Sequence, residues 1–108
     1  MNKNNEKLFY DALSEIADHI GDSFENPISL SLLCLTLGIK NEEKGKIFIS
    51  WNKVLNETNF NDLTIDLFKN ELEAIVSNVY DDKVIKALIK AYSKDLIVEL
   101  YPFSKTLD

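Results

Sequence analysis

The chain has 108 residues and a mass of 12.4 kDa, which is the size of one domain. It carries 18 acidic residues against 12 basic ones, all of them lysine, for a formal net charge of -6. With one cysteine and one histidine, the chain alone cannot build a disulfide scaffold or a four-ligand Cys/His zinc site, and a Ser-His-Asp triad would need the single histidine.

The first predicted element is an amphipathic helix over residues 5–20. Gly21 follows it as a natural stop, because glycine adopts a positive φ at little cost. The apolar residues recur at steps of three and four, as one face of a helix requires; they are Leu8, Phe9, Ala12, Leu13, Ile16, Ala17 and Ile20.

A second helix is predicted over residues 26–37. Asn26 is a good N-cap, Pro27 is favoured at the first helical position, and Gly38 lies just past the end. An alternation of apolar residues in the first half also permits a strand, which this punctuation disfavours. Residues 28–37 leave little polar face, so we expect them to form the central, buried helix or to lie in an oligomer interface.

The third predicted helix has Asn41 as its N-cap, followed by two glutamates in the first turn, where the helix dipole favours negative charge. Its apolar stripe covers residues 47–55, and residues 56–61 predict a polar loop. The fourth helix is expected to begin at Asp62 or Thr64, either of which can cap it.

The last predicted helix is capped by Asp81 or Asp82 and keeps helical spacing to Leu100. Ser93 is a point of interruption, and Pro102 ends the helix because the residue before a proline avoids the α region. The chain therefore predicts an all-α fold, a compact bundle of about five helices.

No segment of the sequence indicates export or membrane insertion. The longest nearly apolar run, residues 28–39, is too short to span a bilayer, and the polar start of the chain lacks a signal-peptide pattern. We expect residues 1–108 to form a single helical domain in the cytoplasm, with Cys34 as a reduced thiol and no membrane partner.

The residues that carry chemistry predict no catalytic, cofactor or metal site. His19 has Asp18 and Asp22 nearby, but they lie on the solvent side of the predicted helix. Cys34 lies among leucines, where burial makes a thiol inert. The carboxylates suit helix capping and solubility, so we expect no enzyme, no cofactor and no metal.

Residues 33–43 resemble the turn of a helix-turn-helix motif. Lys44, however, occupies a position that should be apolar, and the next helix opens with Glu42 and Glu43, which repel phosphates. The chain also has no arginine to contact guanine. We therefore expect no direct nucleic-acid binding.

Several apolar positions and one helix turn together resemble a known family. The matching features are Asn26-Pro27 before an apolar helix, Leu37-Gly38-Ile39 with Glu42-Glu43, Leu67-Phe68, Leu72, Ile85, Ala87-Leu88 and Leu96. In these features residues 27–100 resemble the YhaI-like family of small helical proteins of unknown function from low-GC Gram-positive bacteria. The resemblance implies an all-α fold and no assigned activity.

We expect the protein to act through protein–protein contacts, either by self-association or as an adaptor or regulator. The helix over residues 28–37 has more apolar surface than a small bundle needs, and a homo-oligomer would cover it. The C-terminal residues 101–108 are expected to be held down on their own bundle or on a neighbouring subunit. The candidate interaction surface consists of Ile28, Leu32, Leu35, Tyr101 and Phe103.

An alternative function is an acidic inhibitor, a nucleic-acid mimic from a mobile element that blocks a nucleic-acid-binding enzyme. The excess of 18 acidic residues over 12 lysines favours it. The alternation of lysines with acidic residues along the chain disfavours it, because a mimic needs a continuous negative stripe.

Overall fold

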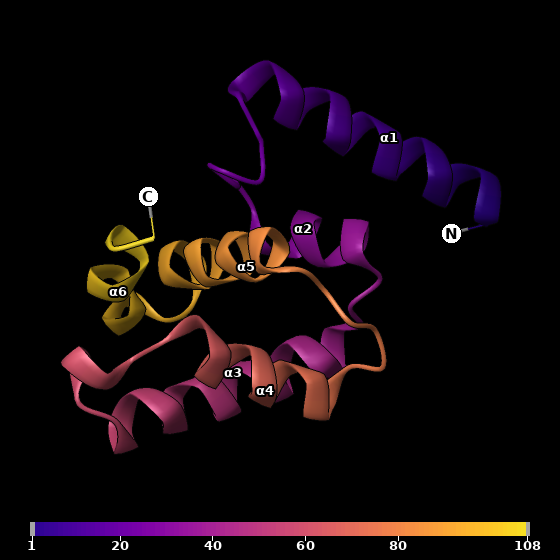
Figure 1. Ribbon diagram of the computed structural model, residues 1–108. Helices are drawn as coiled ribbons and strands as arrows, with labels where there is room; N and C mark the ends of the chain where they lie inside the picture. The colour runs from indigo at the N-terminus through magenta and orange to yellow at the C-terminus, as the bar shows by residue number, and fades with distance from the viewer. Residues whose placement is uncertain (1, 108) are drawn as a thin grey trace.

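The computed structural model describes residues 2–107, and all regular structure in that range is helical (Figure 1). Two short 3₁₀ helices, Phe60–Asp62 and Val98–Leu100, accompany six α-helices. The α-helices are α1 (Lys3–Ile20), α2 (Leu30–Leu37), α3 (Asn41–Glu57), α4 (Ile65–Ile75), α5 (Asp82–Asp95) and α6 (Tyr101–Lys105). The predicted all-α fold is confirmed, with six α-helices in the described range instead of about five.

The core is built around α5, which contacts α2, α4 and α6 (Figure 1). Helix α5 buries seven residues between Ile85 and Ser93. Helix α2, in contrast, leaves Leu35 58% exposed. The prediction that residues 28–37 form the central helix is therefore wrong, because α5 has neighbours on several sides and α2 has an open one.

Four aromatic side chains connect α3, α4, α5 and α6 inside the core. The Trp51 ring lies 5.3 Å from the Phe68 ring and 5.0 Å from the Tyr92 ring, and Phe68 lies 5.3 Å from Phe103. Trp51 Nε1 donates a hydrogen bond to the Phe68 carbonyl at 3.1 Å, and Tyr92 Oη donates to the Lys44 carbonyl at 2.8 Å. These bonds satisfy the polar ends of both rings, so burial of the rings carries no polar penalty.

Helix α2 begins at Leu30, later than the sequence predicted. Ser29 caps it, since its Oγ accepts a hydrogen bond from the Leu32 N–H at 3.2 Å. Asn26 lies four residues before the first helical residue, and its Oδ1 accepts a hydrogen bond from Lys94 Nζ at 2.7 Å. The predicted cap is therefore wrong, and Asn26 and Pro27 belong to the loop before the helix.

Four predicted helix ends are confirmed. Gly21 and Gly38 end α1 and α2 in the left-handed region, at φ values of 107° and 75°. Thr64 caps α4 and Asp81 caps α5, each being one of the two candidates predicted for that position. Local sequence rules therefore place these ends correctly.

The start of α3 differs from the prediction by one residue. Asn41 is the first helical residue, and Lys40 occupies the N-cap position. The Lys40 backbone N–H donates a hydrogen bond to Glu43 Oε1 at 2.8 Å. The side chain of Glu43, at the third helical position, thus satisfies the backbone N–H of the N-cap residue.

The C-terminal part follows a different path from the one predicted. Helix α5 ends at Asp95 and does not continue to Leu100, while Ser93 lies buried within it without interrupting it. The chain then turns so that Ile97 and Leu100 enter the core, with 1% and 0% exposed surface, which a straight extension of α5 would not allow. Pro102 lies in the first turn of α6 instead of ending a helix, since the first-turn N–H groups need no helical partner.

Across residues 2–107, every helix is too short or too polar to cross a membrane.

Candidate protein interaction surface

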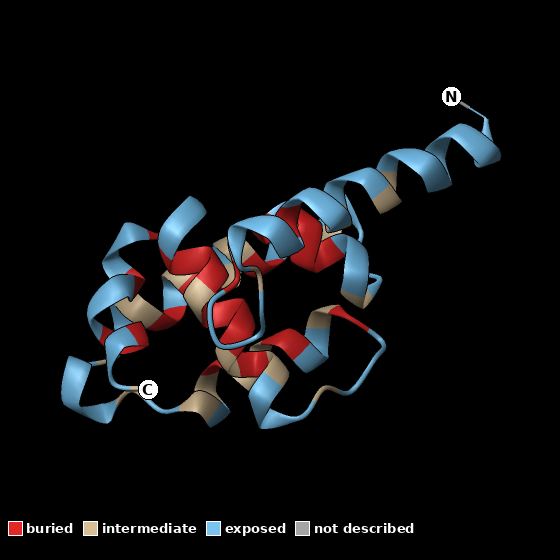
Figure 2. Cartoon of the chain, turned by 90° about the horizontal axis from the view of Figure 1, so that it is seen from above, coloured by how far each residue is buried: buried red, intermediate tan, exposed pale blue. Residues whose placement is uncertain are grey.

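Helix α1 stands apart from the rest of the molecule. It lies over α2, and its N-terminal part extends away from the body (Figures 1 and 2). Within the described chain, Ala17 is the only buried residue of α1. Five large apolar side chains, which we call the α1 stripe, are exposed: Leu8 (68%), Phe9 (58%), Leu13 (38%), Ile16 (57%) and Ile20 (67%).

One edge of α1 attaches it to α2. Tyr10 Oη and Thr36 Oγ1 form a hydrogen bond of 2.9 Å between the two helices. At the end of α1, the Asp22 N–H donates to the Ala17 carbonyl at 2.9 Å, and Asp22 Oδ1 accepts from the Ile28 N–H at 3.0 Å. The helix therefore rests on its Tyr10–Ala17 edge, and most of the stripe faces away from the core.

An apolar groove of about 210 Å³ runs between α1 and α2. Three of the residues predicted as an interaction surface, Ile28, Leu32 and Leu35, lie together along it. Leu35 is exposed and Ile28 half-buried, but Leu32 is buried, so its side chain forms the floor of the groove and the prediction of an exposed Leu32 is wrong. Leu13 and Ile16 of the stripe line the same groove, so stripe and groove form one continuous feature. We call this feature the α1–α2 surface; it comprises the α1 stripe, Ile28, Leu32 and Leu35.

The other two predicted residues, Tyr101 and Phe103, lie elsewhere, on α6. Phe103 is 6% exposed and its ring packs against Phe68, so it belongs to the core and not to an exposed surface. Tyr101 is 47% exposed, and its ring centroid lies 5.3 Å from Lys105 Nζ. The end of the chain therefore covers its own bundle.

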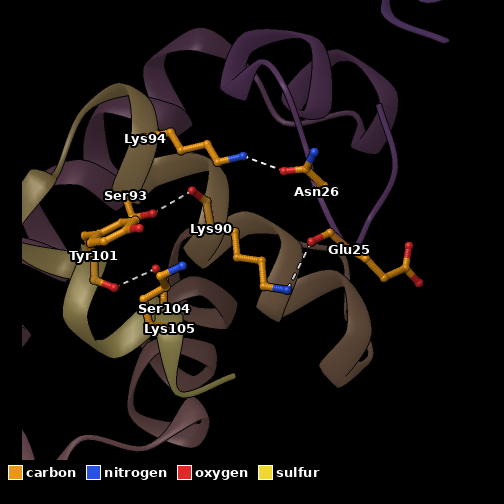
Figure 3. A pocket seen from close by; sticks show the side chains of 8 residues that line it. All are labelled: Glu25, Asn26, Lys90, Ser93, Lys94, Tyr101, Ser104 and Lys105. Carbon is orange, nitrogen blue, oxygen red and sulfur yellow. Dashed lines mark hydrogen bonds between the residues drawn. The ribbon is translucent and has the colours of Figure 1, made fainter. Parts of the chain in front are cut away.

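Tyr101 lines a pocket of about 260 Å³ between α5, α6 and the loop before α2 (Figure 3). Lys90 Nζ donates a hydrogen bond to the Glu25 carbonyl at 3.1 Å. Lys94 Nζ donates to Asn26 Oδ1 at 2.7 Å. These two lysines clamp the loop to α5, and an anion in the pocket would compete with the clamp.

The residues singled out for chemistry lie apart from one another. His19 is exposed on α1, while Cys34 is buried in the core. Burial raises the pKa of the Cys34 thiol to about 11, so the thiol is protonated at neutral pH and is a poor nucleophile. Within residues 2–107, no group of three or more His, Cys, Asp or Glu side chains is placed to hold a metal ion.

The sequence-based prediction placed the interaction surface at residues 28–35 and at Tyr101 and Phe103, and it did not include the α1 stripe. An amphipathic pattern shows that a helix has an apolar face, but it does not tell whether the same chain covers that face. The available signal was the 4-3-4 spacing of Phe9, Leu13, Ile16 and Ile20, which is typical of a seam between paired helices.

Comparison of the chain with known protein families, with curated proteins and with solved structures finds no match. The resemblance to the YhaI-like family therefore stays a prediction. The candidate site is defined by its geometry, a continuous apolar surface on two adjacent helices.

Proposed function

We propose that this protein acts through protein–protein contacts made by the α1–α2 surface, by self-association or as an adaptor, with no catalysis of its own. One observation carries the proposal: a helix of 18 residues buries a single residue and leaves five large apolar side chains in water. Exposed apolar area is unfavourable by roughly 25 cal/mol per Å². Contiguous apolar patches larger than a few hundred Å² mark interaction sites on soluble proteins.

The conformation of α1 itself supports the same proposal. Helices in proteins gain most of their stability from a packed apolar face and not from intrinsic helix propensity. Helix α1 has good ends, with Asn2 as N-cap and Gly21 as C-cap, but little packing between them. A partner seated on the stripe supplies that packing. We propose the cytoplasm as the place of contact, where the lone buried thiol of Cys34 stays reduced.

A photoreactive amino acid at position 16, in the middle of the α1 stripe, tests the proposal in living cells of the organism that encodes the chain. Ile49 is the matched control site, because it is also an isoleucine on a helix and is 69% exposed. Illumination is expected to give covalent adducts from position 16 and only background from position 49. Equal labelling from both positions would rule out a specific docking surface at α1.

The acidic mimic receives less support from the arrangement of charges. Lys83, Lys86, Lys90 and Lys94 follow one another along α5, and three of them bind the adjacent loop. These ammonium groups interrupt the acidic surface on the side of α5, α6 and the loop. A mimic of nucleic acid needs a continuous negative face.

A further inference from the structure

We infer that the occupant of the α1–α2 surface is a second copy of this chain, with the two α1 stripes packed against each other around a two-fold axis. The inference rests on the proposed function and names the partner. A two-fold contact uses the same patch on both copies, so that patch must be able to meet itself. Three properties of the surface satisfy this requirement.

The first property is the spacing of the stripe. Phe9, Leu13, Ile16 and Ile20 follow one another at intervals of four, three and four residues. This is the a/d pattern that brings apolar side chains of two helices together along one seam. The seam extends over most of α1 and ends toward the N-terminus at Glu6.

The second property is the position of the charges on α1. The four residues at the flanking e and g positions carry neither a carboxylate nor an ammonium group; they are Tyr10, Ala12, Ala17 and His19. The acidic residues Asp11, Glu15 and Asp18 lie at outer positions of the same pattern. Two chains of net charge -6 can therefore approach along the seam without like charges meeting there. Recognition of a basic partner would place acidic residues beside the seam, where this helix has none.

The third property is the area of the surface. With about 200 Å² for a whole large apolar side chain, the exposed parts of the α1 stripe and Leu35 amount to roughly 700 Å². A stable interface buries about 800 Å² on each partner. Counted on both copies, the patch buries about 1,400 Å², which lies within the range of about 1,200–2,000 Å² for stable interfaces.

The oligomeric state of the full chain tests the inference. Sedimentation at roughly 50 μM, above the Kd of a micromolar dimer, is expected to give twice the chain mass of 12.4 kDa. The double variant Ile16→Gln/Ile20→Gln removes two seam positions, adds no charge and keeps good helix formers. Because the two-fold axis places each substitution in the interface twice, we expect the Kd to rise at least about 100-fold. The control Ile49→Gln changes an equally exposed isoleucine and is expected to leave the dimer intact.

Circular dichroism of each variant shows that the fold is kept, which separates loss of the dimer from loss of structure. Raising the salt concentration is expected to tighten the wild-type dimer, because salt screens the repulsion between two chains of net charge -6. A complex with a basic partner would instead weaken as salt rises.

The cross-linking experiment separates failure of the inference from failure of the proposed function. An adduct of twice the chain mass from position 16 supports the dimer. An adduct of any other mass, together with a monomeric purified chain, overturns the dimer and leaves the docking surface in place. A dimer that Ile49→Gln weakens as much as the double variant also overturns the inference, because it places the contact elsewhere.

Discussion

Replacing Phe103 by alanine tests whether the end of the chain is part of the core. The Phe103 ring is buried 5.3 Å from the ring of Phe68, which lies 5.3 Å from Trp51. Removing a buried phenylalanine costs about 3–5 kcal/mol, and less where the site can collapse. Because α6 is a five-residue helix near the end of the chain, we expect the lower value, about 3 kcal/mol. Deleting residues 101–108 should cost at least as much.

Tyr101→Ala is the matched control, because Tyr101 is an aromatic residue of the same helix that stays half exposed. Its contact with Lys105 is worth about 0.5–1 kcal/mol at such a site. Urea unfolding, followed by the fluorescence of Trp51, the single tryptophan, should show a midpoint lowered by about 1–3 M for Phe103→Ala. The control should shift far less. Equal midpoints for the two variants would refute a core position for Phe103.

The remaining predictions concern single residues. Asp95 Oδ2 accepts a hydrogen bond from the Leu30 N–H at 2.8 Å, so Asp95→Ala should lower the free energy of unfolding by about 1–2 kcal/mol in urea, and Asp95→Asn by less. Burial raises the pKa of Cys34 from 9.0 to about 11, so the folded chain keeps a proton that the unfolded chain releases, and stability should fall as pH rises above 9. Near pH 10 this loss should be about 1.4 kcal/mol larger than in Cys34→Ala, and parallel pH profiles of the two proteins would contradict it. Gly45→Ala should raise the Tm, because nothing lies within 4 Å of the added Cβ and alanine stabilises a helix by about 1 kcal/mol over glycine. Gly38→Ala should lower the Tm, because a φ of +75° costs alanine about 1–2 kcal/mol. Thermal unfolding followed by circular dichroism checks both, and a Tm shift of the opposite sign would contradict either prediction.

Two of the misplaced helix boundaries, the start of α2 and the end of α5, involve contacts between residues distant in sequence. At the start of α2, Lys94 donates a hydrogen bond to the side chain of Asn26, 68 residues away in sequence. Asp95 accepts one from the Leu30 N–H, 65 residues away. Lys94 and Asp95 both lie in the last turn of α5. The helix ends at Asp95, and the chain then turns so that Ile97 and Leu100 enter the core. Helix ends that depend on their own neighbours, such as those at Gly21 and Gly38, were predictable. Capping rules consider only residues close in sequence, and therefore cannot find the others.

The exposure of the α1 stripe has the same kind of cause. The apolar spacing of residues 5–20 predicts a helix with an apolar face, and the helix is present. Where that face points depends on the loop that follows, which Asp22 and Lys90 hold through the Ile28 N–H and the Glu25 carbonyl. This loop positions α1 so that only one edge of the helix contacts the body. The core is complete without the α1 stripe, since Trp51 and Phe68 are fully buried by other residues. The closed core leaves no space for five more large side chains. The exposed apolar surface of α1 is therefore the observation behind the proposed docking function, in which a partner covers this surface.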